Sequence, residues 1–246
     1  MASTVSLIFR RGVLGVLDEI QLAEDAVNTL KPALLLSLGP FGSAVARQLK
    51  TLRRDFVGIT VAGSAFPTDS RWTTARMYIV ASWRPVADLC ESITNLSCQQ
   101  ERPFVPLVMD SAMLRLGPVF IPGQGGCWDC WTRRSRQHSP SREEHSALAD
   151  HYATHPDDGP QGYLEPFALI GAARISAVMD AADSLFSMGG YLWQIDLMTR
   201  IITTGKVVGI HDCPRCGLHR PPTTRTFSEM RGALAHLWTG DVDNGK

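Results

Sequence analysis

Residues 32–52 read PALLLSLGPFGSAVARQLKTL, and this stretch does most to decide the fold. Its first part, Ala33–Leu38, is a continuous apolar run of the length and composition typical of a buried strand. A glycine turn, GPFGS at 39–43, follows it, and residues 44–52 then carry apolar side chains at helical spacing. A buried strand that enters a helix through a glycine turn predicts an α/β unit of the kind found in parallel sheets.

Strands and helices continue to alternate after this unit. We predict strands at 56–61, 77–80 and 104–109, with a helix over 85–96. A short strand over 116–122 is expected to lead into the first cysteine pair. This alternation predicts an α/β fold with a Rossmann-like, mostly parallel sheet that is flanked by helices and connected by right-handed crossovers.

The second half of the chain is predicted to extend this sheet. Residues 138–162 are rich in small and polar types and poor in large apolar ones, so we interpret them as a long mobile crossover loop. A helix with many small residues is expected over 166–188. Residues 191–197 and 201–210 predict an antiparallel hairpin, which forms a C-terminal extension of the sheet and leads to the second cysteine pair.

Three segments organise the chain. Residues 1–31 form a short N-terminal segment with a predicted strand at 5–9. Residues 32–220 are predicted to be one domain, since chains of this size often form a single core. Residues 221–246 form a tail in which a helix is predicted over 227–237.

Composition and charge narrow the classes of function. Of 246 residues, 44% are apolar and 20% are charged, which is typical of a globular protein. The 24 basic and 24 acidic residues balance, so no basic excess points to a nucleic-acid partner. No apolar run approaches the about 18 residues that cross a membrane, and the N-terminus lacks a signal-peptide pattern. We therefore expect a cytoplasmic protein whose thiols stay reduced.

The strongest chemical motif is a pair of Cys-x-x-Cys units. Its four members are Cys127, Cys130, Cys213 and Cys216. Because zinc takes four tetrahedral ligands and a Cys-x-x-Cys turn supplies two of them, the two pairs predict one structural Zn²⁺ site without an open catalytic position. A redox pair is the alternative for either unit taken alone. Cys90 and Cys98 are interpreted as core or surface thiols and not as nucleophiles.

The glycine turn raises the question of nucleotide binding. Candidate cofactor positions are Gly39, Gly42 and Ser43, which follow a strand and open a helix as a nucleotide-binding loop does. Pro40 removes an amide that would otherwise meet a phosphate. The second strand is followed at 62–66 by AGSAF, without the acidic residue that holds a ribose. We interpret the turn as a degenerate nucleotide loop, and ATP binding is not expected.

The order of these segments resembles the ThiF/MoeB superfamily, whose fold is like that of ubiquitin-activating enzymes. The resemblance spans 32–217 and rests on five stretches: LLLSLGPFGSAVARQL (34–49), LGPVFIPGQGGCWDCWTRR (116–134), PFALIGAARISAVMDAAD (166–183), YLWQIDL (191–197) and CPRCG (213–217). The Gly-Pro-apolar run before CWDC resembles the same stretch in one branch of the superfamily. The proteins of this branch are encoded in gene clusters for peptide natural products, bacteriocins among them. The resemblance implies a partner that presents a precursor leader peptide to a YcaO-type cyclodehydratase, which makes thiazoline and oxazoline rings.

Two departures from the superfamily affect this interpretation. Active adenylating relatives carry acidic residues after the strands that correspond to 56–61 and 77–80, whereas this chain has AGS at 62–64 and ASWR at 81–84. Leader-binding relatives usually carry a winged-helix-like module before the glycine turn, whereas only 31 residues precede Pro32. Either another protein recognises the leader, or the N-terminal strand pairs with a peptide by strand addition.

Several alternatives stay open at this stage. Trp128, Trp131, Arg133 and Arg134 are candidate residues of a peptide or partner surface. Alternatively, the tryptophans pack over the cysteine knuckle and the arginines form a solvated helix face. The main hypothesis is a non-catalytic scaffold subunit, as homodimer or heterocomplex. The alternatives are an ATP-dependent adenylating enzyme acting on a peptide or carrier-protein C-terminus, and a zinc-stapled interaction protein for another peptide-modifying enzyme.

Overall fold

The computed structural model describes most of the central part of the chain. The described residues are 31–217 apart from 62–65, 68, 111, 140, 161, 182–186 and 211–212. The strand predicted at 5–9 and the helix predicted at 227–237 lie outside these residues. Within the described part, none of the helices combines the length and the apolar character that crossing a bilayer requires.

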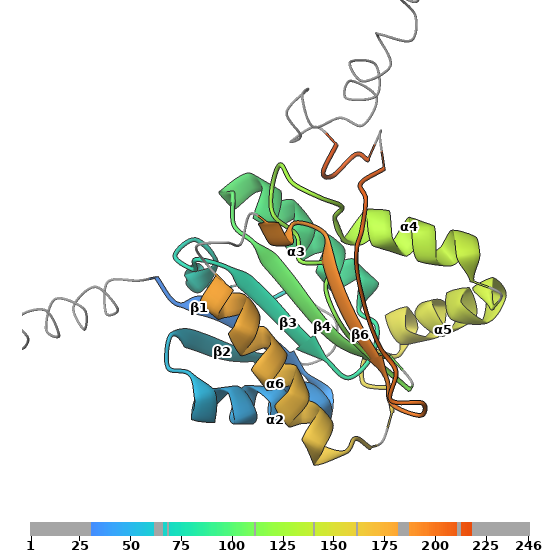
Figure 1. Cartoon of the computed structure of the whole chain (residues 1–246), viewed down its shortest axis with the longest axis horizontal. Coiled ribbons are helices and arrows are strands. Elements are labelled where there is room, and N and C mark those ends of the chain that lie inside the picture. The colour runs from blue at the N-terminus through green and yellow to red at the C-terminus, as the bar shows by residue number, and fades with distance from the viewer. Residues whose placement is uncertain are drawn as a thin grey trace, which may run out of the picture.

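A seven-stranded sheet forms the centre of the molecule, in the order β2-β1-β3-β4-β5-β6-β7 (Figure 1). Its first four strands pair in parallel: β1 (Ala33–Leu38), β2 (Phe56–Val61), β3 (Tyr78–Ser82) and β4 (Phe104–Asp110). All of β1 and β3 is buried, because helices cover both faces of this half of the sheet. The predicted parallel half is therefore confirmed.

The other half of the sheet is antiparallel. It consists of β5 (Met113–Leu116), β6 (Tyr191–Asp196) and β7 (Ile202–Lys206). The predicted hairpin is confirmed, but the strand predicted over 116–122 is wrong. Beyond Leu116 only isolated bridges form, at Phe120 and Ile121, because the prolines in this stretch cannot donate ladder hydrogen bonds.

Helices lie on both faces of the sheet. On one face, α2 (Gly39–Leu52) and α6 (Glu165–Asp180) pack together over β1, β3 and β4 (Figure 1). On the other face, α3 (Ala87–Gln100) and the start of α4 (Trp128–His138) enclose a second apolar cluster. The glycine turn predicted at 39–43 is the first turn of α2, since the helix already begins at Gly39. The α6 helix ends at Asp180, earlier than predicted.

The prediction of a mobile crossover loop over 138–162 is wrong. Most of this segment is the helix α5 (Arg142–Thr154), which lies beside α4 (Figure 1). Seven of its 13 residues are the good helix formers Arg, Glu, Ala or Leu, and Glu143 and Glu144 in its first turn complement the helix dipole. None of its side chains is fully buried, so the apolar periodicity that reveals most helices is absent from the sequence.

Candidate metal centre and adjoining cavities

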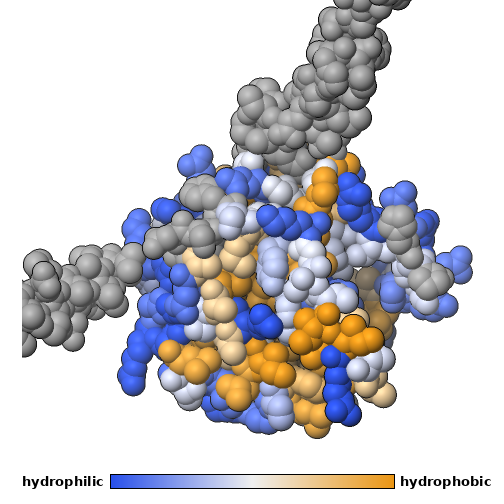
Figure 2. Space-filling model, in the orientation of Figure 1, coloured by the Kyte–Doolittle hydropathy of each residue, from blue (hydrophilic) through white to orange (hydrophobic). Residues whose placement is uncertain are grey.

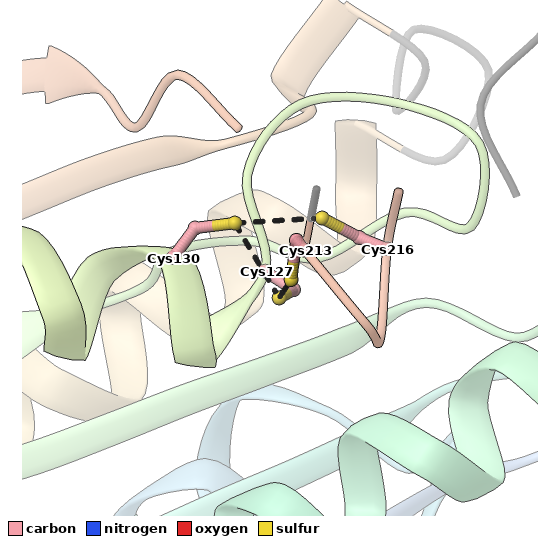
Figure 3. Close-up of side chains that lie close together, drawn as sticks. All are labelled: Cys127, Cys130, Cys213 and Cys216. Atoms are coloured by element: carbon pink, nitrogen blue, oxygen red, sulfur yellow. Dashed lines mark hydrogen bonds between the residues drawn. The ribbon is translucent and has the colours of Figure 1, made fainter. Parts of the chain in front are cut away.

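The two Cys-x-x-Cys units meet at one end of α4. Cys127 caps this helix, Cys130 lies in its first turn, and the other two cysteines belong to the turn at 213–217 (Figure 3). The Sγ–Sγ distance is 3.6 Å from Cys127 to Cys213, 3.5 Å from Cys130 to Cys216 and 3.8 Å from Cys127 to Cys130. All four side chains are buried.

The four sulfurs fit a tetrahedral metal ion. A zinc–sulfur bond of about 2.3 Å gives a tetrahedron with edges of about 3.8 Å. All four Sγ atoms lie within 4.8 Å of one another, and the three distances above come close to that edge. The cluster can therefore hold a metal ion through four thiolates.

Electrostatics within the cluster also favour a cation. The pKa of Cys130 is lowered because the thiol of Cys127 and those of the other two cysteines donate hydrogen bonds to its sulfur. The Ile210 amide also donates to this sulfur, at 3.3 Å. The pKa of Cys127 is raised in turn, because its proton bridges to the neighbouring sulfurs. Four thiolates this close repel one another, so full ionisation requires a cation among them.

Local contacts hold the second knuckle against α3. The Gly217 amide donates to the Cys213 carbonyl at 2.8 Å, and a Cβ on Gly217 would lie 2.5 Å from that oxygen. Arg215 donates to Glu91 on α3 at 2.7 Å, and the Cys98 thiol donates to the Arg215 carbonyl. The cluster thus joins α3, α4 and the segment that follows β7.

Cys90 and Cys98 lie in the core and outside the cluster. Both side chains are buried, and burial raises the pKa of Cys98 to about 11 and that of Cys90 further. A thiol with a raised pKa is a poor nucleophile at neutral pH. The two residues therefore behave as the core thiols that their sequence context suggests.

A cavity of about 240 Å³ lies at the glycine turn, next to the carboxyl end of β1. Gly39 and Ser43 line it, whereas Gly42 packs against β3, where an added Cβ would lie 2.3 Å from the Ala81 carbonyl oxygen. The structure thus brings two of the three candidate cofactor positions to the cavity. Gly42 instead lets the helix approach the sheet closely.

Trp83 fills much of the space beside the glycine turn. Gly39 has a φ of +66°, and a Cβ added there would lie 2.3 Å from Cγ of the Trp83 indole. A Cβ added at Gly159, in the segment after α5, would lie 2.8 Å from the six-membered half of the same ring. The remaining cavity is smaller than the about 300 Å³ at the lower end of ligand pockets. The sequence placed Trp83 after a strand, but only the tertiary structure places its ring on Gly39.

A larger cavity of about 370 Å³ lies between β5, α4 and α5. Trp128 and Trp131 line it, with their ring centres 5.0 Å apart. The other two candidate surface residues are engaged elsewhere. Arg133 pairs with Asp129 at 3.0 Å, and Arg134 donates to the Val208 carbonyl at 3.0 Å. The four candidate residues therefore do not form one surface.

Sequence reasoning missed Arg115, which also lines this larger cavity. It lies on β5, its side chain is buried, and its guanidinium stacks on Trp131 at 3.9 Å from the ring centre. An arginine in a short strand gives no sign in the sequence that it is buried. The alternation of Leu114, Arg115 and Leu116 instead suggests an outward-facing side chain.

Comparison with known proteins relates the chain to other structures by fold. No family model and no curated protein matches it. The heterocyclase TruD has a TM-score of 0.54 and 17% identity over 76% of this chain and 28% of that one. A chain of the E. coli microcin synthetase McbBCD complex has a TM-score of 0.53 and 14% identity, over 75% of this chain and 68% of that one. E. coli MccB has a TM-score of 0.50 and 14% identity, over 78% of this chain and 67% of that one.

These similarities support the fold and no more than the fold. The chain spans only about a quarter of the length of TruD. The similarity covers about three quarters of this chain, in agreement with the α/β fold that the resemblance implied.

Proposed function

We propose that the chain is a non-catalytic partner subunit in ribosomal peptide natural-product biosynthesis. In this role it presents a precursor peptide to a YcaO-type cyclodehydratase that forms thiazole- or oxazole-type rings. The solved structures of similar fold support this proposal, since they include the heterocyclase TruD, a heterocyclase in complex with substrate and cofactor, and a microcin synthetase complex.

One observation carries the non-catalytic part of the proposal: the Trp83 ring lies on Gly39. A nucleotide loop needs an open glycine and free amides facing the phosphates. Here the glycine is covered by an indole, and Pro40, in the first turn of α2, has no amide to offer. The remaining cavity of about 240 Å³ is smaller than the about 300 Å³ at the lower end of ligand pockets.

The adenylating-enzyme alternative is favoured by a different observation. E. coli MccB, which has the same fold, has also been solved with ATP. A chain that adenylates a peptide would need an open phosphate site next to the glycine turn. The Trp83 arrangement speaks against such a site, so we place this function second.

Exposed apolar residues support association with another protein chain. Figure 2 shows apolar side chains along the lower edge of the molecule, over the β6–β7 hairpin and the α2–α6 layer. In the hairpin and the loop that joins its strands, Met198, Ile201 and Ile202 are more than half exposed. All of β7 is exposed, and an exposed edge strand offers unpaired backbone groups to a partner. We propose a heterocomplex or homodimer through this edge.

We propose Zn²⁺ as the structural ion of the cysteine cluster. Four thiolates in a closed tetrahedron are the donor set that zinc prefers, and such sites stabilise a fold without offering a reaction position. Metal analysis of the purified protein tests this directly. One zinc per chain is expected, and an iron–sulfur absorption spectrum instead would contradict it.

Calorimetric titration tests the proposed function. The zinc-loaded protein is titrated in turn with ATP–Mg²⁺, with the precursor peptide encoded beside it and with the neighbouring YcaO-type enzyme. We expect no binding of ATP and tight association with the peptide or the enzyme. Micromolar ATP binding with pyrophosphate exchange would favour the adenylating enzyme. Association with a different modifying enzyme only would favour the zinc-stapled interaction protein.

A further inference from the structure

Arg115 is a buried cation without a polar partner in the described part of the chain. Its side chain points into the larger cavity, and only 5% of the residue is exposed. Its Nε and Nη2 atoms are buried and make no hydrogen bond, and Asp110, the carboxylate whose charge acts on it, forms no ion pair with it. Such a group normally binds a carboxylate or phosphate through its planar fork.

The cavity around Arg115 holds further unused hydrogen-bond donors. Trp128 and Thr132 both line it, and Nε1 of the indole and Oγ1 of the threonine are buried without a partner. Buried polar atoms in native proteins are nearly always satisfied. Several unsatisfied donors around one cavity therefore indicate a site that is complementary to a hydrogen-bond acceptor.

Charge and shape select the kind of acceptor. Burial lowers the pKa of Arg115 to about 10, which leaves the guanidinium charged at neutral pH. Arg136 and His145 also line the cavity, and Asp110 is its acidic group. The rest of the wall is mostly apolar, with Trp131 stacked on the guanidinium. The cavity therefore matches one carboxylate that is attached to, or flanked by, an apolar group.

We propose that this cavity binds an acidic side chain of a peptide, with the Arg115 guanidinium holding the carboxylate and the tryptophans contacting an adjacent apolar residue. The peptide as the source of the carboxylate rests on the proposed function, whereas the recognition of a carboxylate rests on the cavity alone. A free aromatic acid has the same chemistry and is the other source that the experiment distinguishes.

The test uses the zinc-loaded full-length chain and calorimetric titration. The probes are the blocked tripeptide N-acetyl-Leu-Glu-Phe-amide, its Gln counterpart and phenylacetate. We expect the Glu peptide to bind at least about tenfold more tightly than the Gln peptide, which corresponds to about 1.4 kcal/mol. The Trp128 indole N–H signal in nitrogen-15 NMR spectra is expected to shift with the same saturation.

Substitutions assign the binding to the cavity. Arg115→Met is expected to remove the preference for Glu over Gln, and Arg115→Lys, which keeps the charge without the fork, to weaken binding several-fold. Arg174→Met is the matched control, because Arg174 stacks on Trp193 at 4.6 Å and does not line the cavity. It is expected to bind as the parent does.

Three results would overturn the inference. The first is equal binding of the Glu and Gln peptides, and the second is unchanged binding by a folded Arg115→Lys variant. The third, binding of phenylacetate without the Glu peptide, would assign the cavity to a free acid. Titration of the parent protein with the YcaO-type enzyme separates the two proposals. If the parent associates with the enzyme but shows no preference for the Glu peptide, only this inference fails.

Discussion

The two cavities of this molecule have opposite character. The cavity at the glycine turn is narrowed by the chain itself, because the Trp83 ring lies close to both Gly39 and Gly159. The cavity between β5, α4 and α5 is larger and keeps buried donors that the described part of the chain leaves unpartnered. The indole thus narrows the space at the glycine turn. The unpartnered atoms of Arg115, Trp128 and Thr132 belong to residues that line the other cavity, and Trp128 follows the cluster residue Cys127.

Two buried arginines make the same contrast. Arg84 is 2% exposed, donates to the carbonyls of Pro85 and Pro156, and stacks on Tyr152. It holds the segment after α5 in place over Trp83. Arg115 is nearly as buried, but its described neighbours are two indole rings and the charge of Asp110, and its Nε and Nη2 atoms make no hydrogen bond. A partnered buried cation stabilises the fold, whereas an unpartnered one costs stability.

Loss of the cysteine cluster should have the largest effect on stability, and it should affect the region around the Arg115 cavity more than the region around the glycine turn. Cys213→Ser removes one ligand, and we expect a loss of roughly 4 kcal/mol or more in the free energy of unfolding. The melting temperature should fall by about 10 °C or more. Hydrogen exchange should show α4, which carries Trp128 and Trp131, losing protection while β1 and α2 keep theirs. Equal loss in both regions would contradict this division.

The matched control for that variant is Cys90→Ala. Cys90 is buried in the same apolar cluster but lies outside the four-sulfur site. The variant should lose about 1–2 kcal/mol through the small cavity that it leaves. It should keep its metal, which metal analysis of both variants would verify.

Gly39→Ala should have the next largest effect on stability, because it disrupts the contact between the glycine turn and Trp83. The left-handed φ of +66° disfavours alanine by roughly 1–2 kcal/mol, and its Cβ would collide with the Trp83 ring. We expect a total loss of about 2–4 kcal/mol in thermal or urea unfolding. Gly162→Ala is the control, since nothing lies within 4 Å of an added Cβ there. Similar losses for both variants would contradict the tight contact.

The two arginines should respond differently to the same substitution. Arg84→Met should cost about 1–2 kcal/mol, because it removes hydrogen bonds to two carbonyl oxygens. Arg115→Met should lie within about 1 kcal/mol of the parent or be more stable, because methionine fills the site without a buried charge. Urea unfolding of both variants measures the difference. A larger loss for Arg115→Met would mean that its guanidinium serves the fold and not a ligand.

The smallest effect is expected on ATP binding when the indole beside the glycine turn is removed. Trp83→Ala removes the indole from Gly39, but Pro40 still lacks an amide and no acidic residue occurs at 62–65. Calorimetry with ATP–Mg²⁺ should therefore detect no binding for the folded variant. Micromolar binding would reveal a nucleotide site that is blocked but otherwise intact, and the contrast between the cavities would then rest on Trp83 alone.

Agreement between sequence and structure follows the strength of the local signal. The apolar run Ala33–Leu38 and the hairpin strands were predicted correctly, because buried strands leave continuous or alternating apolar patterns. The helix α5 was missed because it buries no side chain completely and thus has no apolar stripe. The prediction of a strand over 116–122 was wrong because it relied on the apolar residues of this stretch. The two prolines there cannot donate the hydrogen bonds that a strand needs.

The sequence by itself determined the chemistry that depends on residue type and spacing. Two Cys-x-x-Cys units predict one tetrahedral site, because each short turn brings two sulfurs together wherever the units lie in the fold. Only the tertiary structure decided which side chains from distant segments share a space. It set Trp83 against Gly39 and turned Arg115 inward beneath Trp131. Such contacts come from packing between elements, and no local pattern in a single sequence encodes them.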